Sequence, residues 1–275
     1  MEVGIVAQRD NDRAEALART LGARLDESGV RVRFDATTAA ALERADAGYP
    51  VNSFDECDLV VSIGGDGTFL FAARGANGTP ILGVNLGEVG FLNAVRPTEA
   101  EHVVQREVDA FQRGELDVQE VPRVAARTDE WVGEPAMNEV VVQGPRRGRG
   151  GGGHVEVRVD GALYDAGPGD GVLVATPTGS SAYNLSERGP LVHPGVDGLI
   201  VNQMAASGGM PPLVLSSDHV VTVTVTDVDY AVVVSDGRTK REVEPGTEVD
   251  VGLADQPVRL AGPAVNFFEA LGKLD

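Results

Sequence analysis

The chain has 275 residues and a mass of 28.7 kDa, enough for one or two domains with a sizeable core. Its 42 acidic and 23 basic side chains give a net charge of −19, which argues against a nucleic-acid binder or docking on an anionic membrane. No apolar run reaches the ~18 residues of a membrane span, the first residues lack a signal-peptide pattern, and the single cysteine, Cys57, excludes an internal disulfide. We therefore expect a cytoplasmic protein with no nucleic-acid and no membrane partner.

The type of charge is as informative as its amount. Lys240 and Lys273 are the two lysines, so arginine supplies the other 21 of the 23 basic residues. A chain rich in acid and poor in lysine is typical of salt-accumulating microbes, where molar salt shortens the screening length to about 3 Å. High-GC codon usage is the alternative explanation.

The first third of the chain alternates between strand and helix patterns. Apolar runs predict strands at 3–7, 30–34, 59–63 and 81–84. Periodic apolar stripes predict helices at 14–25, 39–45, 68–74 and 97–113, and Asn11 or Asp12 can cap the first of them. This alternation indicates an α/β domain over residues 1–115, with a parallel sheet wrapped by helices.

The pattern changes after Gly114, where short β-branched runs replace the helical stripes. They predict strands at 139–143, 154–159, 171–176, 220–226, 231–235, 248–252 and 258–260. Asp160-Gly161 and Asp236-Gly237 are hairpin signals, and the glycine-rich stretch 146–153 is expected to be a mobile hairpin loop. We expect an all-β domain over 116–263, built as a sandwich or stacked sheets. A closing helix at 264–275 is expected to pack back on the first domain.

The strongest chemical signal is Gly64-Gly65-Asp66-Gly67-Thr68, directly after a predicted strand. Glycines at a strand-to-helix turn let backbone N–H groups approach phosphate oxygens. An acid in such a loop repels anions, but it can accept a proton from a substrate hydroxyl or reach a metal or a ribose. The loop is neither a Walker pattern nor GxGxxG. The alternative is a glycine-rich turn with Asp66 as a helix cap.

Two further segments carry polar groups. Residues 176–184, TPTGSSAYN, hold five hydroxyl side chains, and Tyr183 adds an aromatic face that can stack on a base. Asn138-Glu139 stands at the mouth of a predicted buried strand, where polar groups need partners. A carboxylate and an amide can bracket the two hydroxyls of a ribose. The alternatives are a Ser/Thr turn before a helix and a strand-edge cap.

In this order along the chain, these segments resemble the NAD kinase (ATP-NAD kinase) family. The matching blocks are GGDGTFLFAAR at 64–74, PILGVNLGEVGFL at 80–92, NEVVV at 138–142, DGVLVATPTGSSAYNLS at 170–186 and RGPLVHP at 188–194. The resemblance implies an α/β domain followed by an all-β domain. It also implies phosphorylation of the adenosine-ribose 2′-hydroxyl of NAD by ATP to give NADP, in a homodimer or homotetramer whose sites are completed by a neighbouring subunit.

The resemblance also implies roles for individual residues. Asp66 matches the family's proton acceptor, and a divalent cation, Mg²⁺ or another, is expected to bridge the donor phosphates. Phe91 matches an aromatic that packs on the adenine, and Arg149 a loop arginine near the substrate. The full set of expected dinucleotide- and phosphate-binding residues is Gly65, Gly67, Thr68, Phe91, Asn138, Glu139, Arg149, Asp170, Thr178, Ser181, Ala182, Tyr183 and Ser186.

The chain departs from the family in its cations. Residues 202–215, NQMAASGGMPPLVL, contain no arginine where relatives carry one or more, and Gly272 stands where many have arginine. Arg74, Arg146, Arg147, Arg149 or Arg188 can substitute, as can K⁺ or Mg²⁺. The phosphate donor therefore stays open between ATP, another nucleoside triphosphate and polyphosphate. The alternative functions are a non-catalytic NAD(P)-binding paralogue, a lipid kinase of the diacylglycerol or sphingosine type, and a phosphofructokinase-like sugar kinase.

Overall fold

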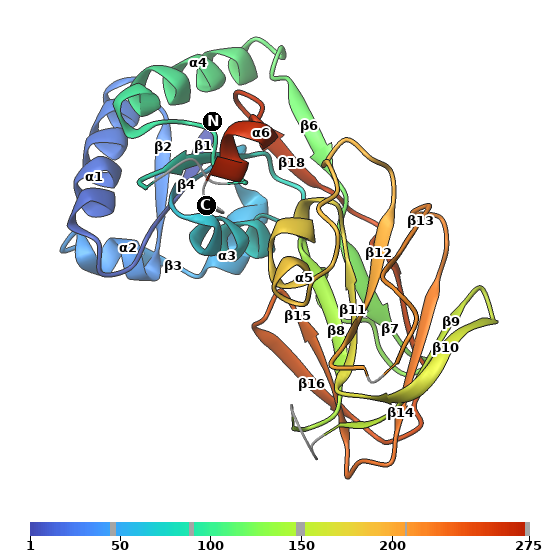
Figure 1. Cartoon of the computed structure of the whole chain (residues 1–275). Helices are drawn as coiled ribbons and strands as arrows, with labels where there is room; N and C mark the ends of the chain where they lie inside the picture. The colour runs from blue at the N-terminus through green and yellow to red at the C-terminus, as the bar shows by residue number, and fades with distance from the viewer. Residues whose placement is uncertain (45–47, 88–90, 147–151, 207, 273–275) are drawn as a thin grey trace. The chain divides into compact units, whose positions relative to one another are not determined.

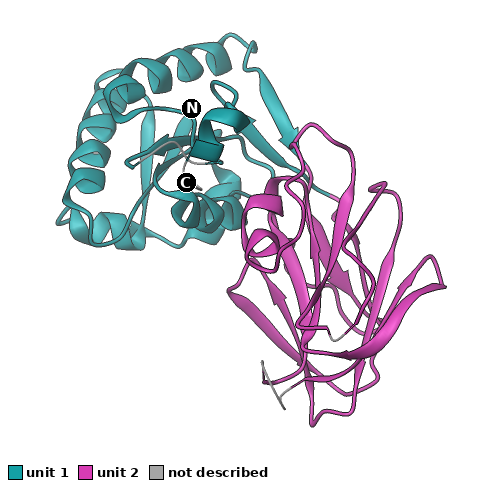
Figure 2. Cartoon of the chain, viewed as in Figure 1, with its two compact units in different colours: residues 1–121, 256–275 teal, residues 122–255 magenta. Residues whose placement is uncertain are grey.

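A computed structural model describes residues 1–44, 48–87, 91–146, 152–206 and 208–272. The chain divides into two compact units (Figure 2). The first contains residues 1–121 and 256–275, and the second contains residues 122–255. No helix in the described part of the chain is long and apolar enough to cross a membrane.

The first unit is a sheet with helices packed on it (Figure 1). Its strands are β1 (Glu2–Ala7), β2 (Arg31–Asp35), β3 (Gly48–Tyr49), β4 (Leu59–Gly64), β5 (Ile81–Asn85), β6 (Val118–Val121) and β18 (Val258–Ala261). Its α-helices are α1 (Asp12–Glu27), α2 (Ala36–Ala41), α3 (Asp66–Ala76), α4 (Ala100–Gln112) and α6 (Phe267–Leu271), and 3-10 turns lie at Val51–Glu56 and Pro97–Glu99. The strand order is β3-β2-β1-β4-β5-β18-β6, parallel except for β6, which runs antiparallel to β18. The predicted α/β architecture is confirmed.

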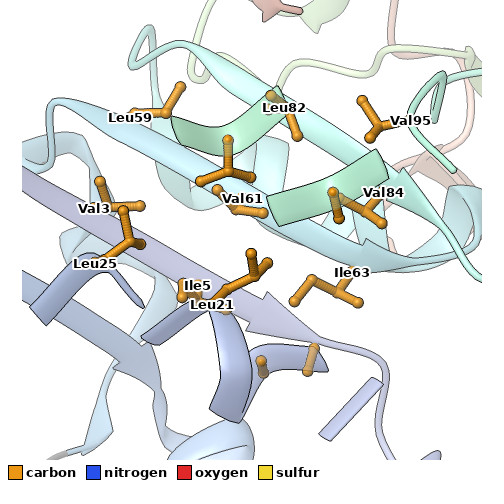
Figure 3. Packing of buried hydrophobic residues seen from close by; sticks show 14 of the residues in the cluster. Val3, Ile5, Leu21, Leu25, Leu59, Val61, Ile63, Leu82, Val84 and Val95 are labelled. Carbon is orange, nitrogen blue, oxygen red and sulfur yellow. The ribbon is translucent and has the colours of Figure 1, made fainter. Parts of the chain in front are cut away.

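Local sequence explains the start of this unit. The side chain of Asn11 caps α1 by accepting hydrogen bonds from the N–H groups of Arg13 (3.1 Å) and Ala14 (3.3 Å). The helix then buries its apolar stripe against one face of the sheet (Figure 3). That face carries alternate residues of the central strands: Val3, Ile5, Leu59, Val61, Ile63, Leu82 and Val84. Because strand side chains alternate between faces, Ser62 and Gly83 belong to the opposite face.

The end of the chain differs from the expectation. Residues 258–261 and 118–121, placed in the all-β domain by the sequence, form β18 and β6 of the first unit's sheet. Leu260 is the residue of β18 that pairs with Ile81 of β5, so a distant segment completes the sheet. The closing helix is shorter than predicted, because α6 covers Phe267–Leu271.

The second unit consists of two sheets. Its strands are β7 (Val124–Arg127), β8 (Glu139–Gln143), β9 (Gly153–Val159), β10 (Ala162–Gly169), β11 (Gly171–Ala175), β12 (Leu199–Met204), β13 (Leu213–Leu215), β14 (Val221–Thr226), β15 (Ala231–Ser235), β16 (Thr239–Val243) and β17 (Val249–Leu253). A 3-10 turn at Thr178–Ser181 and the short helix α5 (Tyr183–Ser186) follow β11. The sheet orders are β10-β9-β14-β17-β7 and β13-β12-β11-β8-β15-β16.

A shared core joins these two sheets. Alternate valines of β8 and β11 pack with alternate valines of β9, β14 and β17. The predicted hairpins are present: the turn residues Asp160 and Gly161 have φ of 47° and 80°, and Asp236 and Gly237 have φ of 46° and 67°. Two consecutive residues with positive φ are typical of type I′ turns, which match the strand twist. The predicted all-β architecture is therefore confirmed as a sandwich.

Candidate functional site

The glycine-rich loop of the first unit connects β4 to α3 (Figure 1). Gly65 is the N-cap of α3, and its carbonyl accepts from the N–H groups of Thr68 (3.0 Å) and Phe69 (3.1 Å). A Cβ at Gly64 would lie 2.5 Å from Oγ1 of Thr68, so only glycine leaves room for that side chain. The loop thus presents the N-terminus of an 11-residue helix, where backbone N–H groups favour an anion.

Asp66 is the first residue of α3, and its carboxylate is held by the segment that follows β5. Oδ2 accepts from the N–H of Phe91 (3.3 Å), and Oδ1 accepts from the N–H of Leu92 (3.3 Å) and from Nδ2 of Asn93 (3.2 Å). The structure therefore brings Asp66 close to the backbone of Phe91, a contact that the sequence did not predict. Three donors on two oxygens fix the orientation of a carboxylate that is half-buried.

Phe91 itself packs against the closing helix. Its ring centroid lies 6.0 Å from that of Phe267 at an interplanar angle of 58°, and Phe267 in turn lies 5.7 Å from Phe268. A tilted pair at this separation is a favourable aromatic contact. The ring of Phe91 thus has a protein partner, and its expected contact with adenine stays a prediction.

In the second unit, Asn138 and Glu139 lie at the start of β8. The carboxylate of Asp236 accepts from the N–H groups of Met137 (2.9 Å), Asn138 (2.8 Å) and Glu139 (3.3 Å). The N–H of Asp236 donates in return to the carbonyl of Glu139 (3.0 Å). The hairpin turn between β15 and β16 therefore fixes the backbone of the Asn-Glu pair. In the sequence, Asp236 indicates only a turn, so its side-chain role was missed.

Glu139 is a buried carboxyl group with an unmatched oxygen. The residue is 5% exposed, and its Oε2 has no hydrogen-bond partner among the described residues. Burial raises the pKa of Glu139 to about 8, and the negative charge of Asp236 adds to this, while the backbone N–H of Tyr183 has the opposite effect. Glu139 is therefore largely protonated at neutral pH, and the O–H of its carboxyl group can donate a hydrogen bond.

A buried arginine stands near the same cluster. Arg123 is 5% exposed, and burial lowers the pKa of its guanidinium, while the negative charges of Asp236 and Glu134 oppose that effect. A guanidinium stays charged in a protein, so it offsets the negative charge of Asp236. Arg123 was also missed by the sequence reasoning, because a lone arginine between two apolar runs carries no signal.

The hydroxyl-rich segment after β11 is bound directly to the Asn-Glu pair. Oγ1 of Thr176 donates to the carbonyl of Met137 (2.6 Å) and accepts from the N–H of Gly179 (3.1 Å), and the N–H of Thr176 donates to the carbonyl of Asn138 (2.9 Å). A Cβ at Gly179 would lie 2.1 Å from the carbonyl oxygen of Asn138. Two motifs nearly 40 residues apart in sequence thus form one surface.

The hydroxyls of this segment divide into two groups. Thr176 and Ser180 are buried and serve the chain itself, because Oγ of Ser180 donates to the carbonyl of Val192 (3.0 Å) and accepts from its N–H (3.1 Å). Two of the five hydroxyl side chains of this segment therefore serve the fold. Among the expected binding residues, Thr178 is buried, Ser181, Ala182 and Tyr183 are partly exposed, and Ser186 is exposed.

Two expected residues do not join this surface. Asp170 precedes β11, whereas the hydroxyl-rich segment follows it, so a strand of about 17 Å separates them at ~3.3 Å per residue. Asp170 is buried beside the far end of β8, where its carbonyl accepts from the N–H of Gly144 (3.0 Å). Arg149 lies outside the described residues.

A cavity of about 510 Å³ borders the segment that lacks arginine. It is lined by Asn202 and Gln203 of β12, and also by Ser186 and Arg188. Arg188 is exposed, with φ of 62°, and it brings a positive charge to the lining of this cavity. The structure therefore brings one of the expected substitute arginines to the cation-poor stretch.

Comparison with known proteins identifies relatives along the whole chain. Two family models match, described as the ATP-NAD kinase N-terminal domain over residues 3–110 and the ATP-NAD kinase C-terminal domain over residues 137–262. The NAD kinases of Halorubrum lacusprofundi and Haloarcula marismortui are each 58% identical, and that of Halobacterium salinarum is 54% identical, with 100% of both chains covered.

Solved structures give the same result. An NAD kinase from Archaeoglobus fulgidus in complex with ATP has a TM-score of 0.80 and 26% identity, covering 100% of this chain and 98% of its own. A yeast NADH kinase complexed with NADH has a TM-score of 0.83 at 21% identity, covering 100% and 87%, which shows a shared fold.

Proposed function

The chain belongs to the ATP-NAD kinase family of phosphotransferases, and from that premise we propose how its own residues phosphorylate NAD to NADP. The reaction transfers a phosphoryl group to the adenosine-ribose 2′-hydroxyl of NAD, with ATP or another phosphate donor. Full-length identity of 58% to NAD kinases rules out the lipid-kinase and sugar-kinase alternatives. Its relatives of 50–58% identity come from halophilic archaea, which fits the acidic, lysine-poor composition.

Asp66 is the proton acceptor in this proposal. The supporting observation is its carboxylate at the glycine-rich loop, oriented by three donors from residues 91–93. Phosphoryl transfer is accelerated mainly by positioning and charge stabilisation, so a fixed carboxylate facing the attacking hydroxyl suits the chemistry. Gly65, Gly67 and Thr68 place the N-terminus of α3 where phosphate oxygens gain from backbone N–H groups.

The second unit holds the dinucleotide. Asn138 and the protonated Glu139 bracket ribose hydroxyls, one through its carboxamide and the other through its buried acid. Tyr183 offers its ring to a base, and Thr178, Ser181, Ala182 and Ser186 supply the surrounding contacts. This assignment is supported by the hydrogen bonds that join residues 137–139 to Thr176 and Gly179.

A divalent cation, Mg²⁺ or another, would be bound to this chain together with the phosphates of the donor. Among the described residues, no group of three or more His, Cys, Asp or Glu side chains is placed to hold a metal ion. Mg²⁺ is commonly bound by substrate phosphates and waters with one or two carboxylates, and Asp66 is a carboxylate at the loop. The bound cation would neutralise charge on the transferring group.

The assembly and the location are also part of the proposal. We propose a homodimer or homotetramer in the cytoplasm, with Asp170 acting on a dinucleotide in a site other than that formed by Asn138 and Glu139 of its own chain. The separation of about 17 Å along β11 supports this arrangement. Asp170 and Arg149 are thus proposed to bind the dinucleotide from a neighbouring copy.

NADP formation from NAD, ATP and Mg²⁺ in a KCl series tests the proposal. We expect activity, oligomer size and melting temperature to rise together between 0.1 M and 2 M KCl, since the screening length falls from about 10 Å to under about 3 Å. Replacing ATP with other triphosphates or polyphosphate identifies the donor. NAD binding without NADP formation in any donor would instead favour the non-catalytic paralogue.

A further inference from the structure

Asn93 is a fully buried polar residue beside the proposed proton acceptor. Its exposed fraction is 0%, and its Nδ2 donates to Oδ1 of Asp66 (3.2 Å). The orientation of the carboxamide follows from chemistry, because a carboxylate accepts hydrogen bonds and only the Nδ2 end can donate one. The Oδ1 end must then point away from Asp66.

That second end lies against the sheet. A Cβ at Gly83 of β5 would lie 2.3 Å from Oδ1 of Asn93 and 3.0 Å from its Cα. Any side chain at position 83 would displace Asn93, so the glycine makes room for it. The carboxamide of Asn93 thus occupies the space that a side chain at position 83 would fill.

Two polar atoms on this face of the sheet are buried. Oδ1 of Asn93 and Oγ of Ser62 are both buried and both lack a hydrogen bond among the described residues. Ser62 pairs in register with Gly83 on the neighbouring strand, and parallel partners present their side chains on the same face. Ser62 therefore carries a second buried polar atom on the face of the sheet against which Asn93 lies.

We propose that Asn93 is a positioning residue for Asp66, with its carboxamide packed against Gly83. This inference rests on the proposed role of Asp66. The backbone N–H groups of Phe91 and Leu92 bind one oxygen each, so the Asn93 carboxamide is the third, side-chain restraint on the carboxylate. Because Asn93 is buried against the sheet, its carboxamide fixes the position of the Asp66 carboxylate relative to the sheet.

The physical consequence concerns turnover, not substrate binding. An error of about 1 Å in the position of a catalytic group can cost about 10²-fold in rate. We expect Asn93→Ala to lower kcat about 10- to 100-fold while the KM values for NAD and ATP change less than about twofold. Gly83→Ala should do the same, because its methyl group displaces the carboxamide.

Thr79→Val is the matched control. Thr79 is also buried in the first unit, and its Oγ1 donates to the carbonyls of Cys57 (3.2 Å) and Asp55 (3.4 Å). Thr79→Val and Asn93→Ala both delete hydrogen bonding by a buried side chain, so both should lower the melting temperature. Only Asn93→Ala should lower kcat per folded molecule. Equal kcat values for the two variants would overturn the proposal.

A double-mutant cycle separates this inference from the role of Asp66. If Asn93 acts through Asp66, Asn93→Ala should change kcat less than about twofold in the Asp66→Asn background. A full 10- to 100-fold loss in that background would show that Asn93 acts independently, which overturns the inference. Near-normal turnover of Asp66→Asn alone would instead refute the proposed function of Asp66.

Discussion

Asp66 in the first unit and Glu139 in the second are both acids beside a predicted binding loop, yet their surroundings differ. Asp66 is half-buried, and its two carboxylate oxygens together accept three hydrogen bonds. Glu139 is 5% exposed, keeps one oxygen without a partner in the described structure, and has its pKa raised to about 8 by burial and by Asp236. Environment assigns different tasks to chemically similar groups. The comparison therefore predicts an oriented proton acceptor in one unit and a neutral hydrogen-bond donor in the other.

The largest expected effect is that of Asp66→Asn. The amide keeps the size of the side chain but cannot accept the proton, so we expect kcat to fall about 10²- to 10⁴-fold. NAD affinity, measured by calorimetry, should stay within a few-fold because the second unit is unchanged. Near-normal turnover would remove Asp66 from the mechanism and with it one side of the comparison.

The second effect concerns Glu139 and pH. A folded-state pKa of about 8, above the ordinary 4.5, means that the folded state binds more protons than the unfolded state between these values. The stability that protonated Glu139 contributes is therefore fully present below about pH 4.5, and it is lost as the pH rises towards 8. Between pH 6 and pH 9 we expect the unfolding free energy to fall by about 3 kcal/mol, at 1.36 kcal/mol per pKa unit.

Glu139→Gln is the matched control, because glutamine is neutral at every pH and keeps a donor. Denaturant melts of both proteins at pH 6 and pH 9 isolate the contribution of Glu139, since all other groups titrate alike. Identical pH profiles would show that Glu139 is ionised in both the folded and the unfolded state between pH 6 and pH 9, and would overturn its role as a neutral donor.

The sequence predicts the architecture better than the connections within the site. The strands 139–143 and 231–235 are predicted with the bounds that the structure has, because β-branched runs are strong signals. β16, with the sequence TKREV, was missed because it is an exposed edge strand without an apolar face. β10 was missed because glycines and Pro168 interrupt it, which an edge strand tolerates.

The same limit explains the residues missed at the site. The motifs around Asp66 and Asn138 could be singled out from the sequence, because each is a local pattern of neighbouring residues. Asp236 binds the backbone of residues 137–139 from 97 to 99 residues away, and Asn93 reaches Asp66 across 27 residues. Such partners depend on strand register and on the space left by Gly83 and Gly179, which no local window of sequence specifies.

The smallest expected effect distinguishes the aromatic residue of each unit. Base–aromatic stacking contributes about 1–3 kcal/mol in nucleic-acid complexes, which corresponds to about 5- to 150-fold in binding. Tyr183 is partly exposed beside Glu139, whereas the ring of Phe91 already packs against Phe267 at 6.0 Å. We expect Tyr183→Ala to raise the KM for NAD within that range, and to leave the KM for ATP nearly unchanged.

Phe91→Ala should mainly lower the melting temperature, since it removes an aromatic pair. Initial rates over an NAD series, with thermal melts of both variants, check the difference. A larger rise in KM for Phe91→Ala would assign the adenine contact to the first unit and reverse this part of the comparison.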